Sequence, residues 1–214
     1  MRRPERLEID HRTIKLLVGL IALALANATS FFSDHSITSI SESYHYGGWA
    51  RDFLVGALFA IAALMAAYNG FSVREMVLTK IAALAALGVA LFPCQCATHE
   101  EVIPKVHGVS AAVMFMILAE LCRVFYVRAK EKRLQKARNR ATLYLVCGVG
   151  ILLSIAILAA DHFLSGALVA REPRLVFYCE RAGLIFFGLA WLAASHILPG
   201  FTDDEERWFR GKRN

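Results

Sequence analysis

Six apolar stretches, each long enough to cross a lipid bilayer, dominate this 214-residue chain. They cover residues 14–32, 52–70, 76–93, 104–124, 141–160 and 176–198. Each approaches the roughly 20 residues that an α-helix needs to span a hydrocarbon core of about 30 Å. A bilayer offers no hydrogen-bond partner to the backbone, and the short alternating segments of a β-barrel are absent from the sequence. The sequence therefore predicts an all-α integral membrane protein, with six transmembrane helices in one bundle formed by residues 1–214 as a single domain.

The distribution of basic residues predicts the orientation of these helices. Segments 1–15, 70–80, 123–140 and 199–214 hold 19 of the 24 Lys and Arg residues. Short cytoplasmic loops are enriched in Lys and Arg, so both termini are predicted to be cytoplasmic, with residues 199–214 as a cytoplasmic tail. The basic run 123–140 is expected to attract anionic lipid head groups. Within it, segment 126–140 is expected either to extend the preceding helix or to precede the next one as a solvated basic helix. No recognition motif or aromatic platform accompanies it, so no nucleic-acid partner is expected.

The first apolar stretch also resembles a signal peptide. A charged segment precedes LLVGLIALALA, and Ala24-Leu25-Ala26 is similar to a cleavage site. The apolar run continues through Phe31 and Phe32, which favours an uncleaved membrane helix. Cleavage would leave five helices without turning the others over.

Polar side chains gather at the predicted outer ends of the helices. Ionisable groups at membrane depth are costly unless they are paired, so they are expected to face the bundle interior. The candidate ligand-binding residues of an outward-facing polar pocket are Ser43, His45, Asp52, His107, Tyr178, Glu180 and Arg181. Arg181 and a neutral His107 beside an acid would suit a phosphate or carboxylate. Recognition of a lipid head group is therefore the predicted function. The alternative is that the pairs Arg51–Glu180 or Asp52–Arg181 merely hold helix ends together.

Cysteines of the predicted outer face allow two interpretations. Cys94, Cys96 and His99 lie close enough in sequence to bind a soft metal ion, with His107 as a further candidate ligand. The two cysteines of a Cys-x-Cys sequence are poorly placed to form a disulfide with each other. In an oxidising compartment, a disulfide of Cys94 or Cys96 with Cys179 is therefore the favoured prediction. Cys122 and Cys147 are expected to be buried apolar residues. No metal or cofactor is predicted.

Two other functions remain open. An accessory or assembly subunit of a larger membrane complex would fit the small size and the absence of a soluble domain. A metal-dependent membrane hydrolase would use zinc-bound water as its nucleophile. Ser41, Ser43, His45 and Asp52 are similar to residues of ceramidase-like hydrolases, but the late histidine pair of those enzymes is missing. An enzyme is therefore the less expected outcome. Membrane lipids, a membrane protein partner or a second copy of the chain are the expected partners.

The order of features resembles a group of small six-helix membrane proteins, comprising bacterial families of unknown function and, more distantly, the eukaryotic DRAM/SFK-type proteins. The resemblance rests on four segments, SITSISESYHYGGWARD, RDFLVGALFAIAALMAAYNG, GVALFP and VHGVSAAVMFMIL. Cys94 departs from the polar residue expected after Phe-Pro. The resemblance implies a lipid or membrane-stress role and a shared site that includes Ser43, Asp52 and His107. Together with the charge bias, it implies a bacterial inner membrane location.

Overall fold

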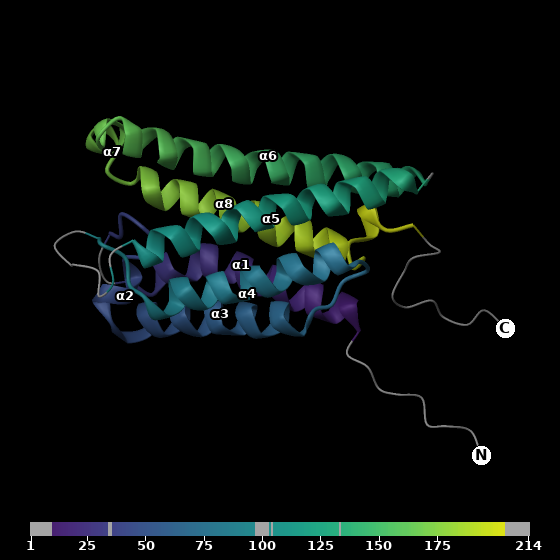
Figure 1. The fold of residues 1–214 in the computed structure, drawn as a ribbon, viewed down its shortest axis with the longest axis horizontal. Helices are drawn as coiled ribbons and strands as arrows, with labels where there is room; N and C mark the ends of the chain where they lie inside the picture. The colour runs from purple at the N-terminus through teal and green to yellow at the C-terminus, as the bar shows by residue number, and fades with distance from the viewer. Residues whose placement is uncertain (1–9, 34–35, 97–102, 104, 133, 204–214) are drawn as a thin grey trace, which may run out of the picture.

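A computed structural model describes residues 10–33, 36–96, 103, 105–132 and 134–203. The described chain is α-helical throughout, with one 3-10 turn at Pro199–Phe201. Six of the helices are long (Figure 1). They are α1 (His11–Phe31), α3 (Gly48–Ala67), α4 (Val73–Leu91), α5 (Val106–Glu131), α6 (Gln135–Phe163) and α8 (Leu175–Ala194). The short helices α2 (Ser43–Tyr46) and α7 (Ala167–Arg171) lie in the connections.

The six long helices correspond to the six predicted stretches. Five of them, α1, α3, α5, α6 and α8, are long and apolar enough to cross a membrane, and the protein is therefore an integral membrane protein of the α-helical type. The sixth, α4, carries Arg74, Glu75 and Lys80 in its first two turns, and its membrane crossing stays a prediction. The basic run is divided between its two neighbours, whereas the sequence left open which of them it joins: α5 continues to Glu131 and α6 begins at Gln135.

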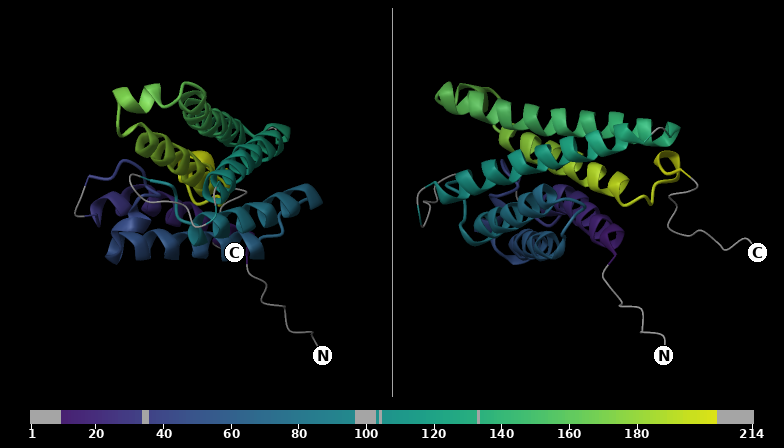
Figure 2. Two further views of the ribbon diagram at one scale, coloured as in Figure 1. Left: turned by 60° about the vertical axis from the view of Figure 1, so that its left-hand side comes forward. Right: turned by 45° about the vertical axis from the view of Figure 1, so that its right-hand side comes forward.

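Successive long helices run antiparallel and close into a ring. The neighbours around it are α1 with α3, α3 with α4, α4 with α5, α5 with α6, α6 with α8, and α8 with α1. Figures 1 and 2 show α5, α6 and α8 on one side and α1, α3 and α4 on the other. The first and last long helices of the chain are therefore direct partners.

Small residues allow α1 and α8 to approach closely. A methyl group on Gly19 would lie 2.9 Å from the carbonyl oxygen of Gly188, and one on Gly188 would lie 3.0 Å from the carbonyl oxygen of Gly19. Such reciprocal small residues are typical of membrane helix pairs, where close backbone packing replaces the hydrophobic effect.

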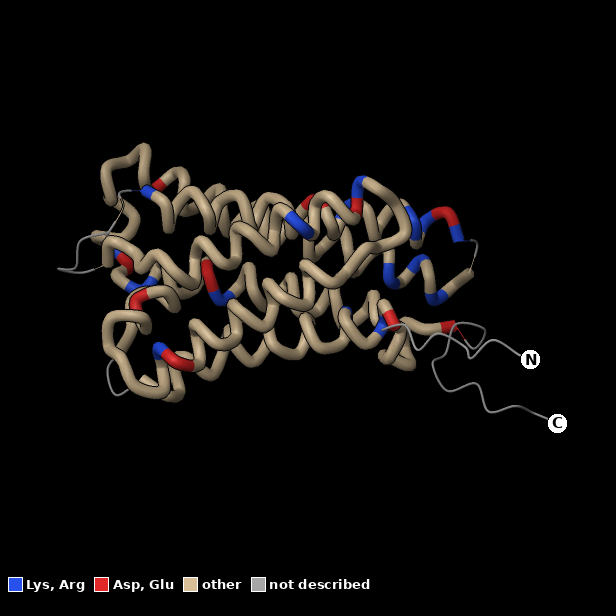
Figure 3. Tube along the Cα trace, turned by 60° about the horizontal axis from the view of Figure 1, so that its bottom comes forward, with Lys and Arg blue, Asp and Glu red and all other residues tan. Residues whose placement is uncertain are grey.

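The antiparallel arrangement gives the bundle two chemically different ends. We name the end that holds Asp10, Tyr68–Ser72, Lys132 and Asp203 the basic end. We name the end that holds Thr38–Gly47, Pro93–Cys96 and Leu164–Arg174 the cap end. Lys and Arg gather at the basic end, as Figure 3 shows in blue. This asymmetry agrees with the predicted topology, in which the basic end is cytoplasmic, although the orientation itself stays a prediction.

Candidate functional site

At the cap end, Glu180 of α8 binds the loop before α2 rather than an arginine. Its carboxylate accepts hydrogen bonds from the Ser39 hydroxyl at 2.9 Å, the Ile40 amide at 2.5 Å and the Ser41 hydroxyl at 3.0 Å. The Phe177 amide, at the start of α8, also donates to the carbonyl oxygen of Thr38 at 2.9 Å. Glu180 therefore fastens the loop to the first two turns of α8 instead of standing open to a ligand.

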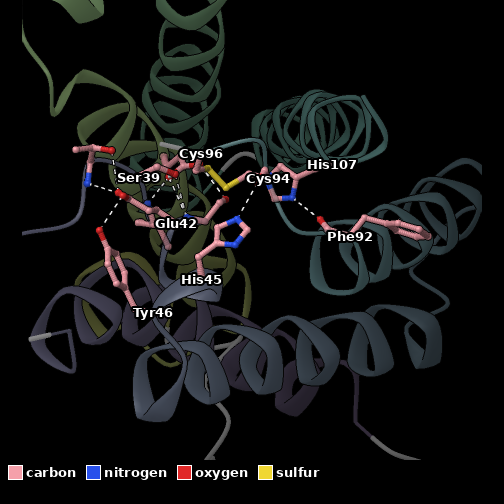
Figure 4. The surroundings of a disulfide bond; sticks show 12 residues. Ser39, Glu42, His45, Tyr46, Phe92, Cys94, Cys96 and His107 are labelled. Carbon is pink, nitrogen blue, oxygen red and sulfur yellow. Dashed lines mark hydrogen bonds between the residues drawn. A yellow bond between two sulfur atoms is a disulfide. The ribbon is translucent and has the colours of Figure 1, made fainter. Parts of the chain in front are cut away.

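A second carboxylate, that of Glu42, closes the same loop on itself. It accepts from the amide and hydroxyl of Thr38 at 2.6 and 2.8 Å and from the Tyr46 hydroxyl at 2.9 Å (Figure 4). Burial raises the pKa of the Glu42 carboxyl, but these hydrogen bonds outweigh it and hold the pKa below the ordinary value of 4.5. The same contact raises the pKa of Tyr46.

We expect the loop before α2 to open more readily in the Glu42→Gln variant than in wild type at neutral pH. In acid, the loop should open equally readily in both proteins. Because the folded-state pKa of Glu42 is depressed, its stabilisation is present above pH 4.5 and is lost as the pH falls through the folded-state pKa. Hydrogen exchange of the Thr38 amide, which donates directly to Glu42, is the measurement. Glu172→Gln, an exposed carboxylate at the same end, is the control and should exchange like wild type. Equal protection of wild type and Glu42→Gln at pH 7 would contradict the prediction.

Two histidines fix the chain that follows α4. His107 Nδ1 donates to the carbonyl oxygen of Phe92 at 2.8 Å, and His45 Nε2 donates to that of Cys94 at 2.8 Å. These bonds connect α5 and α2 to the segment around Pro93 (Figure 4). Both predicted site histidines therefore bind backbone carbonyls at the cap end.

The predicted disulfide to Cys179 is wrong in this structure. Cys94 is bonded to Cys96, and Cys179 is a buried free thiol on α8. The Cα atoms of Cys94 and Cys96 are 5.3 Å apart, inside the range that a disulfide requires, because the chain after Pro93 is not helical. Cys122 and Cys147 are buried free thiols, as predicted.

The other predicted pocket residues do not meet one another. Asp52 pairs with its neighbour Arg51 at 3.3 Å on the exposed start of α3, and Arg181 donates to Asn27 of α1 at 2.6 Å. The alternative pairs Arg51–Glu180 and Asp52–Arg181 are therefore not formed. Tyr178 is half-exposed, and the hydroxyl of Ser43 is buried without a hydrogen-bond partner in the described part of the chain. His99 lies outside the described residues.

The basic end contains a buried ionic cluster that the sequence analysis missed. Glu75 of α4 is completely buried and forms an ion pair with Arg128 of α5. Its carboxylate also accepts from the Tyr68 hydroxyl at 2.5 Å and from the Phe71 amide at 3.1 Å. The backbone amide of Glu75 in turn donates to Ser72 at 3.2 Å, so the Ser-x-x-Glu pattern caps α4 and turns the carboxylate toward α5.

Next to this cluster, Lys15 of α1 is caged by aromatic rings. Its Nζ lies 5.4 Å from the ring centre of Tyr68, 5.1 Å from that of Phe71 and 5.1 Å from that of Phe125. The residue is 4% exposed. Among the residues described, none offers Lys15 Nζ a hydrogen-bond acceptor or a carboxylate within ion-pair distance. Cation–π contact thus stabilises an ammonium group that retains its capacity to donate three hydrogen bonds.

A cavity of about 330 Å³ adjoins this ammonium group. A second hollow of about 420 Å³ lies beside it and shares the lining residues Lys15, Phe71 and Lys132. The cationic residues that line one or both are Arg12, Lys15, Arg128, Lys132 and Arg140. Within the described part of the chain, Asp10 is the one acidic residue that lines them. Phe71, Phe125 and Tyr144 supply apolar wall, so the site combines positive charge with apolar surface.

The sequence contains one signal for this site. Lys15 lies inside the first apolar stretch, where an ionisable residue indicates function, but its place near the N-terminal end of that stretch also fits a topology-determining charge. The rings that cage it come from two distant segments, the connection that holds Tyr68 and Phe71 and the helix α5 that holds Phe125, and no sequence spacing brings these segments to Lys15.

No protein-family model matches the chain, and no curated protein or solved structure matches it significantly. The resemblance to six-helix families therefore stays a prediction, and a function has to be inferred from the geometry of the site.

Proposed function

We propose that this membrane protein binds a phosphate-bearing group, the head group of an anionic phospholipid, in the cavity at its basic end. The observation that carries the proposal is the buried Lys15 ammonium, which adjoins a cavity with further cationic walls and has no oxygen partner among the described residues. A desolvated cation gains most from an ionised acceptor, because charge-assisted hydrogen bonds are the strong ones.

The mixed character of the walls supports a lipid over a fully hydrated anion. Arg128, Lys132 and Arg140 provide charge, whereas Phe71, Phe125 and Tyr144 provide surface for the apolar part of an amphiphile. With the predicted orientation, the ligand would come from the cytoplasmic leaflet. The proposal thus keeps the head-group recognition expected from the sequence but assigns it to the end opposite the predicted outer pocket.

We expect Lys15→Met to bind anionic lipid at least about tenfold more weakly than wild type, since one charge-assisted hydrogen bond contributes about 1.5–3 kcal/mol. The measurement is native mass spectrometry after incorporation into nanodiscs of phosphatidylglycerol or of phosphatidylcholine. Lys130→Met is the matched control, because Lys130 is exposed on α5 and does not line the cavity. A parallel titration with inorganic phosphate distinguishes a lipid from a free anion.

Trp191 provides an independent signal for this binding. Its ring lies 5.5 Å from that of Tyr68 and 6.0 Å from that of Phe125, two members of the Lys15 cage. Ligand entry should change its fluorescence in wild type and in Lys130→Met, but not in Lys15→Met. Equal lipid retention by Lys15→Met and wild type would contradict the proposal. If the protein binds inorganic phosphate but no lipid, the ligand of the cavity would be a soluble phosphate compound and not a phospholipid. The accessory or assembly subunit, which the sequence left open as an alternative, stays a prediction.

A further inference from the structure

A separate cluster of metal-ligating side chains lies at the cap end. The ligand atoms of His45, Cys94 and Cys96 all lie within 4.8 Å of one another. Figure 4 shows the His45 imidazole beside the Cys94–Cys96 disulfide. His45 belongs to α2, whereas the cysteines follow α4, so the fold unites residues that are about fifty positions apart.

The two segments that carry these ligands are held by contacts other than the disulfide. The Glu42 hydrogen bonds fix the loop before α2, and His107 binds the carbonyl oxygen of Phe92, just before Pro93. Cys94 is buried. Reduction of the disulfide would therefore leave the two sulfurs close to His45.

The hydrogen bond of His45 also orients its ring. Nε2 donates to the Cys94 carbonyl oxygen at 2.8 Å, which holds the imidazole against the cysteine segment. A carbonyl oxygen can only accept, so this bond also fixes the tautomer of the ring in the oxidised form.

We propose that His45, Cys94 and Cys96 form a redox-controlled site for one soft d¹⁰ metal ion, Cu(I) or Zn²⁺. In the oxidised form the sulfurs are joined and offer no thiolate. A dithiol reductant would transfer two electrons and two protons to the disulfide, giving two Cys thiols and becoming a disulfide itself. Metal binding would then release the two thiol protons and form two metal–sulfur bonds and one bond to the imidazole.

The donor set selects this class of metal. Two thiolates and one imidazole favour Cu(I) or Zn²⁺ over hard cations such as Mg²⁺ or Ca²⁺, which prefer oxygen ligands. Three ligands complete a trigonal Cu(I) site, whereas Zn²⁺ would need a fourth ligand. The inference is independent of the phosphate site at the basic end.

The test uses the full-length protein in detergent, reduced anaerobically with a phosphine and desalted after addition of one equivalent of Cu(I) or Zn²⁺. Elemental analysis should find one metal ion per chain in reduced wild type and none in the oxidised protein. His45→Ala and Cys94→Ser should each lose the metal to an equimolar chelator. Cys179→Ser, which removes another buried thiol, should retain it.

Absorption from sulfur-to-metal charge transfer provides a second readout that does not depend on folding yield. The band should appear in reduced wild type and Cys179→Ser and be absent from Cys94→Ser. Retention of the metal by His45→Ala would overturn the three-ligand assignment. Equal binding by oxidised and reduced protein, or no binding by reduced wild type, would overturn the site.

Discussion

The Glu75→Gln variant is expected to lose about 3 kcal/mol of unfolding free energy, because removing one partner of a buried ion pair leaves an uncompensated charge. Glu75 is fully buried and is the ion-pair partner of Arg128, with Lys15 caged nearby. Arg128 retains partial exposure, which places the expected loss at the lower end of the range for buried pairs. Unfolding in mixed micelles, followed by Trp191 fluorescence, is the measurement.

Glu120→Gln is the matched control for this variant. Glu120 also joins α4 to α5, through Arg74, and pairs with Arg123, but these arginines are exposed. Exposed ion pairs contribute about 0–1 kcal/mol, so the control should unfold almost like wild type. If Glu75→Gln and Glu120→Gln lose the same unfolding free energy, the Glu75–Arg128 pair does not stabilise the basic end.

Alanine at Gly19 and at Gly56 should change stability in opposite directions. At Gly19 the added methyl group meets the backbone carbonyl of Gly188 and the side chain of Leu192, both at 2.9 Å. Overpacking of this kind costs about 1–3 kcal/mol. Gly56 of α3 has open space where its methyl group would lie, so alanine there should be neutral or stabilising by up to about 1 kcal/mol.

The same unfolding assay compares the two alanine variants. Gly188→Ala, which approaches the contact from α8, should reproduce the loss seen at Gly19, since its methyl group would lie 3.0 Å from the Gly19 carbonyl oxygen. A neutral Gly19→Ala would show that α1 and α8 can separate without cost.

The sequence predicted the helices well because length and apolar character are local properties. The predicted and observed ends differ by a few residues; α4, for example, ends at Leu91, shortly before Pro93, which cannot continue the helix. Length and apolar character support five membrane-spanning helices. Whether α4 is the sixth depends on how its charged first turns are accommodated.

The site was harder to predict because its residues meet only through the ring of helices. Nothing in the spacing of Ser39 and Glu180 indicates that a carboxylate on the last helix binds a loop 141 residues earlier. Grouping polar residues by predicted membrane side identified Glu180 and His107 as cap-end residues but not their partners. The close spacing of Cys94 and Cys96 argues against a bridge between them, whereas the non-helical backbone after Pro93 allows it.

Closure of the ring by α1 and α8 has a consequence for biosynthesis. The ribosome delivers α1 first, yet the helix that packs against Gly19 is the last long helix to emerge. Until then, α1 can pair with α3 while its other face meets lipid or the insertion machinery. The partly assembled protein therefore passes through a stage with an open seam, at which quality control could distinguish chains that lack α8 from chains that contain it.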